Sequence, residues 1–228
     1  MLGVYITSCN YRPFIRWALD SVLAQTRKPD VIVFVDDASV DGSPDFIKSF
    51  NADRLKFDDF IVHAENQGTV KTINEGAQRC IDLGCDIFCG LSADDVFKPT
   101  YLEETEKFLL AQPENVGYVY THVRRIGDEN QYDIHPEFNA DLLRQMPYVH
   151  GSSLFRSIAW QDAGGLRDLP REEDWDLTKR LAELGWKGKL LPQALLLWRK
   201  HRNHNRTVDG NDSGKLREAE IKKGGKKE

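Results

Sequence analysis

The sequence predicts an α/β protein in which a mostly parallel sheet is flanked by helices. Short apolar runs alternate with segments of helical periodicity through the first half of the chain. Such alternation is typical of parallel strands that are joined by covering helices. The run over residues 31–35 is continuously apolar, as expected of a strand that is buried on both faces.

The elements of the first half follow from this alternation. Strands are expected over residues 2–8, 31–37, 60–64 and 85–92. Helices carry apolar residues three or four positions apart, and they are expected over residues 12–25, 44–50, 70–81 and 99–108. Pro13 suits the first turn of a helix, and Asp41-Gly42 predicts a turn before the second helix.

The pattern is looser after Pro113. Alternation over residues 116–126 predicts a strand, and residues 127–131 predict a turn. Short helices are expected over residues 139–146 and near 159–165, with a longer helix from about Glu173 to Leu184. Strands are expected over residues 151–156 and 190–198, the latter interrupted at Pro192.

Composition narrows the function. The chain has 228 residues, a formal charge of −5 and 40% hydrophobic residues, which excludes a disordered chain or a small disulfide scaffold. The mildly acidic balance argues against a nucleic-acid partner, because such binders carry a basic field. No apolar run approaches the ~20 residues that span a bilayer, and the first residues lack a signal-peptide pattern. We therefore expect a cytoplasmic protein.

The four cysteines favour the same compartment. Cys80, Cys85 and Cys89 are separated by four and three residues, unlike the pairs of zinc ribbons. Cys85 and Cys89 are expected on one face of a strand together with Ile87. We expect reduced, buried thiols, Cys9 included, rather than a metal cluster or a disulfide.

Polar clusters follow three of the expected strands, where ligands bind in parallel sheets. They comprise residues 7–10, Asp36-Asp37, and residues 92–95. Any one cluster could be a turn or a helix cap. Because three separate strands deliver such residues to one edge, we interpret this edge as a ligand site.

Each acidic cluster has two interpretations. Asp94-Asp95 could hold Mg²⁺ or Mn²⁺ that bridges to phosphates, or could decorate the start of a helix. Asp36-Asp37 could accept hydrogen bonds from a ribose or a nucleobase. No G-x-G-x-x-G loop accompanies this pair, which disfavours a nicotinamide enzyme.

Two further clusters lie late in the chain. The acidic run over residues 172–176 could supply a general base, or could be first-turn decoration of a helix. Arg199, His201, His204 and Arg206 lie close together after an expected strand. A histidine there could bind a metal, or the whole run could be a solvated face.

Taken together and in this order, these motifs resemble the family 2 glycosyltransferases, which have the GT-A fold. Seven segments carry the resemblance, over roughly residues 4 to 207. They are ITSCNYRPFIRWALDSVLAQT, VIVFVDDASVDGS, ENQGTVKTINEG, LSADDVFKPTYLE, GSSLFRSIAWQDAGGLRD, EEDWDLTKRLAELG and LWRKHRNHN. The ordered set is far more specific than any single segment.

The resemblance implies a GT-A fold with a Rossmann-like, mostly parallel mixed sheet. It implies one domain over residues 1–210, with a nucleotide-sugar-binding half over 1–115 and an acceptor-binding half over 116–210. Residues 211–228 would form a polar basic tail. Such a tail could be solubilising, or could make weak peripheral contact with the inner face of a membrane.

The resemblance also implies roles for individual residues. Asp174 is the expected catalytic base, with Glu173 as the second choice. Mn²⁺ or Mg²⁺ would be held by Asp94, Asp95 and His201. The donor, a nucleotide-diphospho-sugar and preferably a UDP-sugar, would be bound by Thr7, Asn10, Arg12, Asp36, Asp37, Asn66, Lys71, Ser92 and Asp94.

The implied reaction is inverting, metal-dependent transfer of one sugar to a hydroxyl of a saccharide or a lipid-linked acceptor, in glycan or polysaccharide biosynthesis. The Q-x-x-R-W motif of processive synthases is absent from the sequence. Ser92 stands where the family has the first Asp of its D-x-D motif, and Ile73 where many members have Arg; Lys71 could replace that charge. These departures leave an alternative, a non-catalytic nucleotide-sugar-binding protein with the same fold.

Two other classes fit less well. A nucleotidyltransferase would need a glycine-rich phosphate loop near the first strand, which ITSCNYRP lacks. Glycoside hydrolysis also uses paired carboxylates, but it gives no reason for Asp36-Asp37 at the edge of the sheet.

Overall fold

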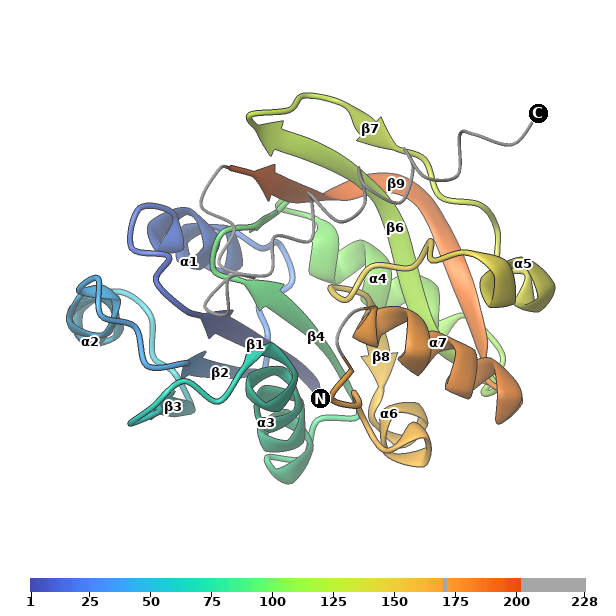
Figure 1. Ribbon diagram of the computed structural model, residues 1–228, viewed down its shortest axis with the longest axis horizontal. Coiled ribbons are helices and arrows are strands. Elements are labelled where there is room, and N and C mark those ends of the chain that lie inside the picture. The colour runs from blue at the N-terminus through green and yellow to red at the C-terminus, as the bar shows by residue number, and fades with distance from the viewer. Residues whose placement is uncertain (170–171, 202–228) are drawn as a thin grey trace, which may run out of the picture.

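The computed structural model describes residues 1–169 and 172–201 and contains one mixed sheet with helices on both faces (Figure 1). Its strands are β1 (Leu2–Ser8), β2 (Val31–Asp36), β3 (Asp59–Val62), β4 (Ile87–Ser92), β5 (Val96–Phe97), β6 (Val116–Gly127), β7 (Tyr132–Asp133), β8 (Leu154–Arg156) and β9 (Lys187–Lys200). Its helices are α1 (Ile15–Leu23), α2 (Ser43–Asp53), α3 (Thr69–Asp82), α4 (Tyr101–Leu110), α5 (Ala140–Gln145), α6 (Ser157–Ala163) and α7 (Glu173–Glu183). The predicted α/β class is confirmed.

The directions of the strands decide which of them end at the edge of the sheet where the polar clusters lie. The sheet order is β3-β2-β1-β4-β8-β6-β9-β5, with β7 attached to β6. The first four strands are parallel, and β8 is antiparallel to both β4 and β6. Two reversals restore the original direction, so β6 and its parallel neighbour β9 end at the same edge as β1, β2 and β4. Strands from both predicted halves therefore share one sheet.

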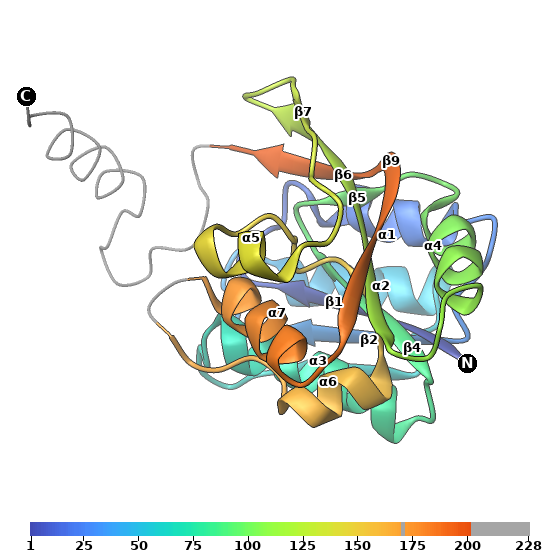
Figure 2. The same cartoon turned by 90° about the vertical axis from the view of Figure 1, so that its right-hand side faces the viewer.

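Two apolar layers hold the sheet between its helices (Figure 2). One layer packs α1, α2 and α4 against the sheet through residues such as Leu19, Ile47 and Leu102. The other packs α3, α5, α6 and α7 on the opposite face through residues such as Ala77 and Leu181. Alternate residues of each central strand supply the two layers, as the pleat requires.

One close approach fixes the centre of the sheet. The ring of Tyr5 on β1 lies against Gly90 of β4 and Gly76 of α3. A Cβ atom on Gly90 would lie 2.3 Å from the Tyr5 ring, and one on Gly76 would lie 2.9 Å from it. Both positions therefore require glycine, because the buried ring cannot move without disturbing the packed core.

Pro192 does not interrupt the last strand. Strand β9 runs from Lys187 through Lys200, and its pairing with β6 shifts register between Leu191 and Ala194. The two residues in between, Pro192 and Gln193, are accommodated at this irregularity, where proline is tolerated because no ladder amide is needed. The expected interruption was wrong, and the short strands β5 and β7 were not expected.

The cysteines differ from expectation in two respects. All four are free, and Cys80, Cys85 and Cys89 are buried, but Cys9 is partly exposed. Cys85 lies before β4 and packs with Cys80 in the layer beneath α3, whereas Ile87 and Cys89 face the other layer. The prediction that Cys85 shares a face with these two residues was wrong, because the strand begins only at Ile87.

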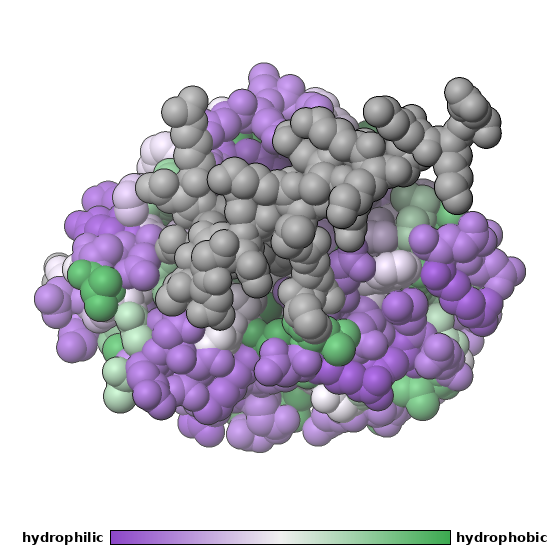
Figure 3. Space-filling model, viewed as in Figure 1, coloured by the Kyte–Doolittle hydropathy of each residue, from purple (hydrophilic) through white to green (hydrophobic). Residues whose placement is uncertain are grey.

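The first helix begins later than expected, at Ile15, with Phe14 as its N-cap. Trp17 of this helix is 54% exposed. None of the helices in the described part of the chain is both long and apolar enough to cross a membrane. The visible face in Figure 3 is mainly hydrophilic outside the grey atoms, with scattered hydrophobic residues.

Candidate functional site

The loops that follow β1 and β2 are bonded to each other at the carboxyl edge of the sheet. Asn10 receives a hydrogen bond on Oδ1 from the amide of Val40, and its own amide donates to Ser39 Oγ, both at 2.8 Å. Asn10 and Ala38 have positive φ angles, 58° and 57°. Left-handed backbone is costly for alanine and is tolerated by asparagine, and the mutual hydrogen bonds hold both loops in this conformation.

Asp36 holds the second of these loops in place. Its side chain is fully buried, and it accepts hydrogen bonds from the amide and the hydroxyl of Ser39, both at 2.8 Å. Burial raises the pKa of Asp36, while the bonds from Ser39 act in the opposite direction. The structure therefore assigns the two Asp36 oxygens to contacts within the protein.

Arg12 and Thr7 lie beside these loops. The Arg12 amide donates to Asp41 at 2.8 Å, and its guanidinium lies 4.0 Å from the centre of the Phe46 ring on α2. Thr7 pairs in register with Ser92 on the neighbouring strand β4. Two residues that were predicted to bind the sugar nucleotide, at the ends of β1 and β4, are thus adjacent.

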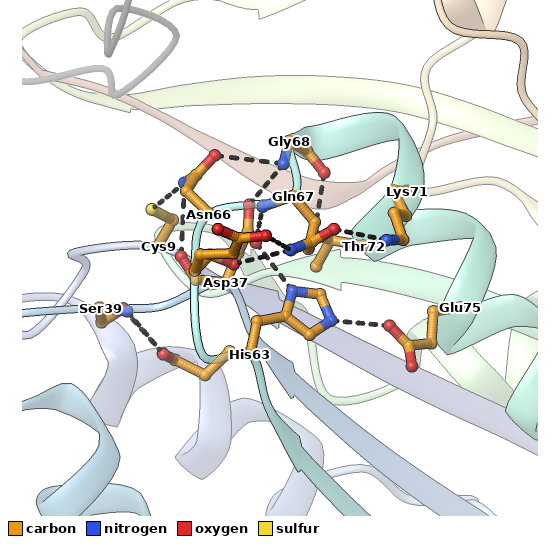
Figure 4. Close-up of polar contacts among 12 residues, drawn as sticks. Cys9, Asp37, Ser39, His63, Asn66, Gln67, Gly68, Lys71, Thr72 and Glu75 are labelled. Carbon is orange, nitrogen blue, oxygen red and sulfur yellow. Dashed lines mark hydrogen bonds and ion pairs between the residues drawn. The ribbon is translucent and has the colours of Figure 1, made fainter.

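The loop before α3 folds around the Asp37 carboxylate (Figure 4). Asp37 accepts hydrogen bonds from the amides of Gln67 and Gly68, at 2.7 and 3.0 Å, and contacts His63 Nδ1 at 2.8 Å. The Asn66 side chain donates to the Asp37 carbonyl at 3.4 Å and accepts from the Gly68 amide at 3.1 Å. The structure thus brings the predicted residues Asp37 and Asn66 together.

Lys71 lies in the first turn of α3, where its ammonium group contacts the Gln67 side chain. The Lys71 residue is exposed, and Figure 4 shows its side chain extending from the helix beside the loop that surrounds Asp37. An exposed cation in this place can contact an anionic ligand at the edge of the sheet.

The acidic pair after β4 is buried, with Asp94 and Asp95 only 3% and 6% exposed. His201 Nε2 lies 3.2 Å from Asp94 Oδ2, because β9 ends at the same edge as β4. Asp95 instead accepts a hydrogen bond from the Arg199 amide at 2.8 Å. Burial and the charge of Asp94 together raise the pKa of Asp95. The two neighbouring carboxylates therefore have different partners.

Arg199 lies between this acidic pair and helix α1. Its Nε donates to the Asp94 carbonyl at 2.8 Å, and its guanidinium lies 4.4 Å from the Trp17 ring and 5.0 Å from the Phe14 ring. Burial lowers the pKa of Arg199, while both carboxylates oppose that shift. The exposed Trp17 ring therefore packs against the guanidinium of Arg199.

The donor atoms at this edge suit a divalent cation with few protein ligands. Within residues 1–169 and 172–201, no three His, Cys, Asp or Glu residues form a group that could hold a metal. Mg²⁺ is usually bound by one or two carboxylates together with waters and substrate phosphates, and imidazole also suits transition metals. Asp94 and His201 therefore fit a cation whose other ligands come from a phosphorylated substrate. His204 and Arg206 lie outside the described residues.

The third acidic cluster begins α7. Glu172 has a positive φ of 63°, Glu173 is buried, and Asp174 is partly exposed. The Asp174 carboxylate lies against Gly151, where a Cβ atom would be 2.8 Å from either oxygen. Burial, and to a lesser extent the charge of Asp174, raises the pKa of Tyr5. Asp174 therefore approaches the central strand β1 from the second half of the chain.

Two site residues were missed in the sequence. His63 sits in an ordinary polar stretch after a strand, and its role depends on groups from β2 and α3. Gly151 is one glycine among 17, and only its contact with Asp174 distinguishes it. Neither has a local sequence signal, because both are defined by contacts distant in the chain.

Comparisons with known proteins give the family and the fold. The model of a family described as Glycosyl transferase family 2 matches residues 3–166. An uncharacterized glycosyltransferase of Haemophilus influenzae is 26% identical over 190 residues, which cover 80% of this chain and 69% of that relative.

Two solved structures share the architecture. Staphylococcus aureus TarS 1–349 in complex with UDP-GlcNAc has a TM-score of 0.70 at 16% identity, over 88% of this chain and 58% of that chain. Mannosyltransferase PcManGT from Pyrobaculum calidifontis, in complex with GDP-Man and Mn²⁺, has a TM-score of 0.69 at 19% identity, over 89% of this chain and 58% of that chain. The chain thus spans less than two thirds of either solved chain.

Ala38→Gly should stabilise the protein. Ala38 has a φ of 57°, a conformation that glycine adopts without a Cβ clash. Glycine also has a greater conformational entropy in the unfolded chain, which opposes the gain. We expect the free energy of unfolding to rise by a net ~0.5–1 kcal/mol. Urea denaturation measures this change. Ala111→Gly is the matched control, because Ala111 has an ordinary φ of −83° and should lose stability. A loss at both positions would contradict the strain at Ala38.

Proposed function

The chain belongs to glycosyl transferase family 2, and from this membership we propose that it transfers one sugar from a nucleotide-diphospho-sugar to an acceptor hydroxyl with inversion. Its sheet and flanking helices have the GT-A fold of its structural neighbours. The observation that carries the proposal is the contact between Asp94 and His201, which lie 107 positions apart and meet at the edge that also holds Asp37.

The donor would lie along the carboxyl edge of the sheet. Its base and ribose would be near Thr7, Asn10, Arg12, Asp37 and Asn66, which the loop contacts gather there. Asp36 would act by holding the loop rather than by touching the nucleotide, because Ser39 occupies both of its oxygens. The complexes of TarS with UDP-GlcNAc and of PcManGT with GDP-Man support a sugar nucleotide as the ligand class.

The diphosphate would lie near Lys71, Ser92 and Asp94. Asp94 and His201 would hold Mn²⁺ or Mg²⁺, and PcManGT in complex with Mn²⁺ supports this assignment. When bound, such a cation offsets the negative charge that develops on the leaving diphosphate. Asp95 would hold the end of β9 in place through the Arg199 amide, so that His201 reaches Asp94.

Asp174 would be the general base. An acceptor hydroxyl has a pKa far above neutrality, so a positioned carboxylate must take its proton as the oxygen attacks the anomeric carbon. Attack from the face opposite the diphosphate inverts that carbon. Partial exposure makes Asp174 accessible to a saccharide or lipid-linked acceptor, whereas Glu173 is only 8% exposed.

A donor screen tests the function. Nucleotide release from UDP-, GDP- and dTDP-sugars is measured with and without Mn²⁺, using simple saccharides as acceptors. We expect metal-stimulated release with one nucleotide class, UDP-sugars being favoured. Binding of a sugar nucleotide without any turnover would instead support the non-catalytic alternative, which Ser92 and Ile73 motivate.

Asp94→Ala and His201→Ala should each weaken metal-dependent nucleotide binding by about tenfold or more, because each removes one protein ligand of the cation. Calorimetric titration with the preferred sugar nucleotide, at several Mn²⁺ concentrations, measures the loss. Asp86→Ala is the control, since Asp86 lies just before β4, at the opposite edge, and is exposed. An unchanged Mn²⁺ dependence in both variants would refute this metal assignment.

Asp174→Asn should abolish transfer, by ~10²-fold or more, because the amide cannot take the acceptor proton. Donor affinity should stay within about twofold, since the proposed role concerns only the acceptor. Steady-state turnover and calorimetry give the two quantities. Glu173→Gln is the companion variant, and a larger loss of turnover there than in Asp174→Asn would reverse the assignment of the base.

A further inference from the structure

His63 lies between two carboxylates that come from different elements. It follows β3, and its amide donates to the Asp36 carbonyl at 2.9 Å. Its ring places Nδ1 2.8 Å from Asp37 Oδ1 and Nε2 2.7 Å from Glu75 Oε2. The side chain is only 10% exposed, and Figure 4 shows the ring spanning the gap between the Asp37 loop and helix α3.

This geometry favours a protonated ring. A neutral imidazole has one donor nitrogen and one acceptor nitrogen, so it would direct a lone pair at one of the two carboxylates. Only the imidazolium donates to both. The charged groups that face the ring are Asp37 at the end of β2 and Glu75 on α3. Burial lowers the pKa of His63, but the hydrogen bonds to Asp37 and Glu75 outweigh it and raise the pKa above 6.5.

We propose that His63 is a positioning residue for sugar-nucleotide binding, which acts by joining the Asp37 carboxylate to helix α3 as an imidazolium. The inference rests on the proposed function, in which Asp37 lies beside the nucleotide. His63 also contributes a positive charge to a loop that must accept an anionic ligand. Glu75 is the second positioning residue, because it holds the outer side of the ring.

Loss of the proton breaks this link on one side. Neutral His63 keeps a single donor. The Asp37 side chain is 5% exposed and cannot turn to water, whereas Glu75 is 35% exposed and can. The connection to α3 is therefore the one released, and the Asp37 charge loses its compensation. Donor affinity should fall as the pH rises through the pKa of His63.

The same proton links stability to pH. Because the folded-state pKa is raised above the ordinary value of 6.5, the contribution of His63 to stability is complete below that value. It is lost as the pH rises through the folded-state pKa. Urea denaturation of the wild type and His63→Gln should differ most at low pH and converge at high pH.

Binding measurements test the positioning role. Calorimetry with the sugar nucleotide chosen by the donor screen, from about pH 5.5 to about pH 8.5, spans the histidine range. Wild-type affinity should fall by about five- to tenfold, which by linkage corresponds to a pKa change of about one unit on donor binding. His63→Gln should lack this step and bind at the high-pH affinity of the wild type throughout.

The variant Glu75→Gln tests whether His63 acts by positioning the binding loop or only by stabilising the fold. Removing this carboxylate lowers the pKa of His63, so the step should persist but move to lower pH. Asp82→Asn, near the other end of α3, is the control and should leave the midpoint unchanged. An NMR titration of the His63 ring in the free protein gives its pKa without any ligand, and should show the same downward shift in Glu75→Gln.

The results of these measurements test the positioning role of His63 separately from the proposed function. If sugar nucleotides bind but the pH step survives in His63→Gln, the positioning role is refuted and the proposed function stands. A free-protein pKa of His63 below 6.5 would refute it equally. If no sugar nucleotide binds at any pH, the proposed function fails and the inference falls with it.

Discussion

Two adjacent carboxylates are buried after β4, and the site depends on how the protein stabilises them. An uncompensated buried charge costs on the order of several kcal/mol. Asp95 accepts a hydrogen bond from the Arg199 amide, and Asp94 meets His201. Both partners come from the end of β9, so this strand must run parallel to β6 and reach the edge where β4 ends. The mixed topology of the sheet thus satisfies an electrostatic requirement.

The same contacts connect the two halves of the site. Arg199 rests on the Phe14 and Trp17 rings, and the His201 ring lies 4.5 Å from the Phe14 ring, centre to centre. Phe14 follows the loop that holds Asn10. The loop proposed to contact the nucleotide and the pair proposed to hold the cation therefore share one aromatic support. A displacement of either would disturb both.

Much of the architecture could be predicted from the sequence, because periodicity is a local property. The succession of strands and helices along the chain, and the edge at which the polar clusters meet, follow from the alternation of apolar runs. Pro192 misled the prediction, since pairing with the long strand β6 outweighs a local breaker. His63 and Gly151 were missed for the opposite reason. Their importance lies in contacts with residues far along the chain, and neither residue type is unusual in its own segment.

In each acidic cluster, the two neighbouring carboxylates have different surroundings. In the first cluster Ser39 occupies both oxygens of Asp36. In the second, Asp95 holds the Arg199 amide while Asp94 faces His201. In the third, Glu173 is buried and Asp174 is partly exposed. Successive side chains of a strand point in opposite directions, which separates Asp36, at the end of β2, from Asp37.

This separation has a physical advantage at an anionic site. Two neighbouring carboxylates that both faced the ligand would repel each other and the phosphates of the donor. Hydrogen bonds from protein donors to one of them offset part of that repulsion and fix the backbone that carries the other. Asp37 differs from Asp94 and Asp174, because its buried carboxylate accepts hydrogen bonds from two amides and also contacts His63. The ring of His63 is the titratable group that the fold places beside this buried carboxylate, and it links that carboxylate to Glu75 on α3.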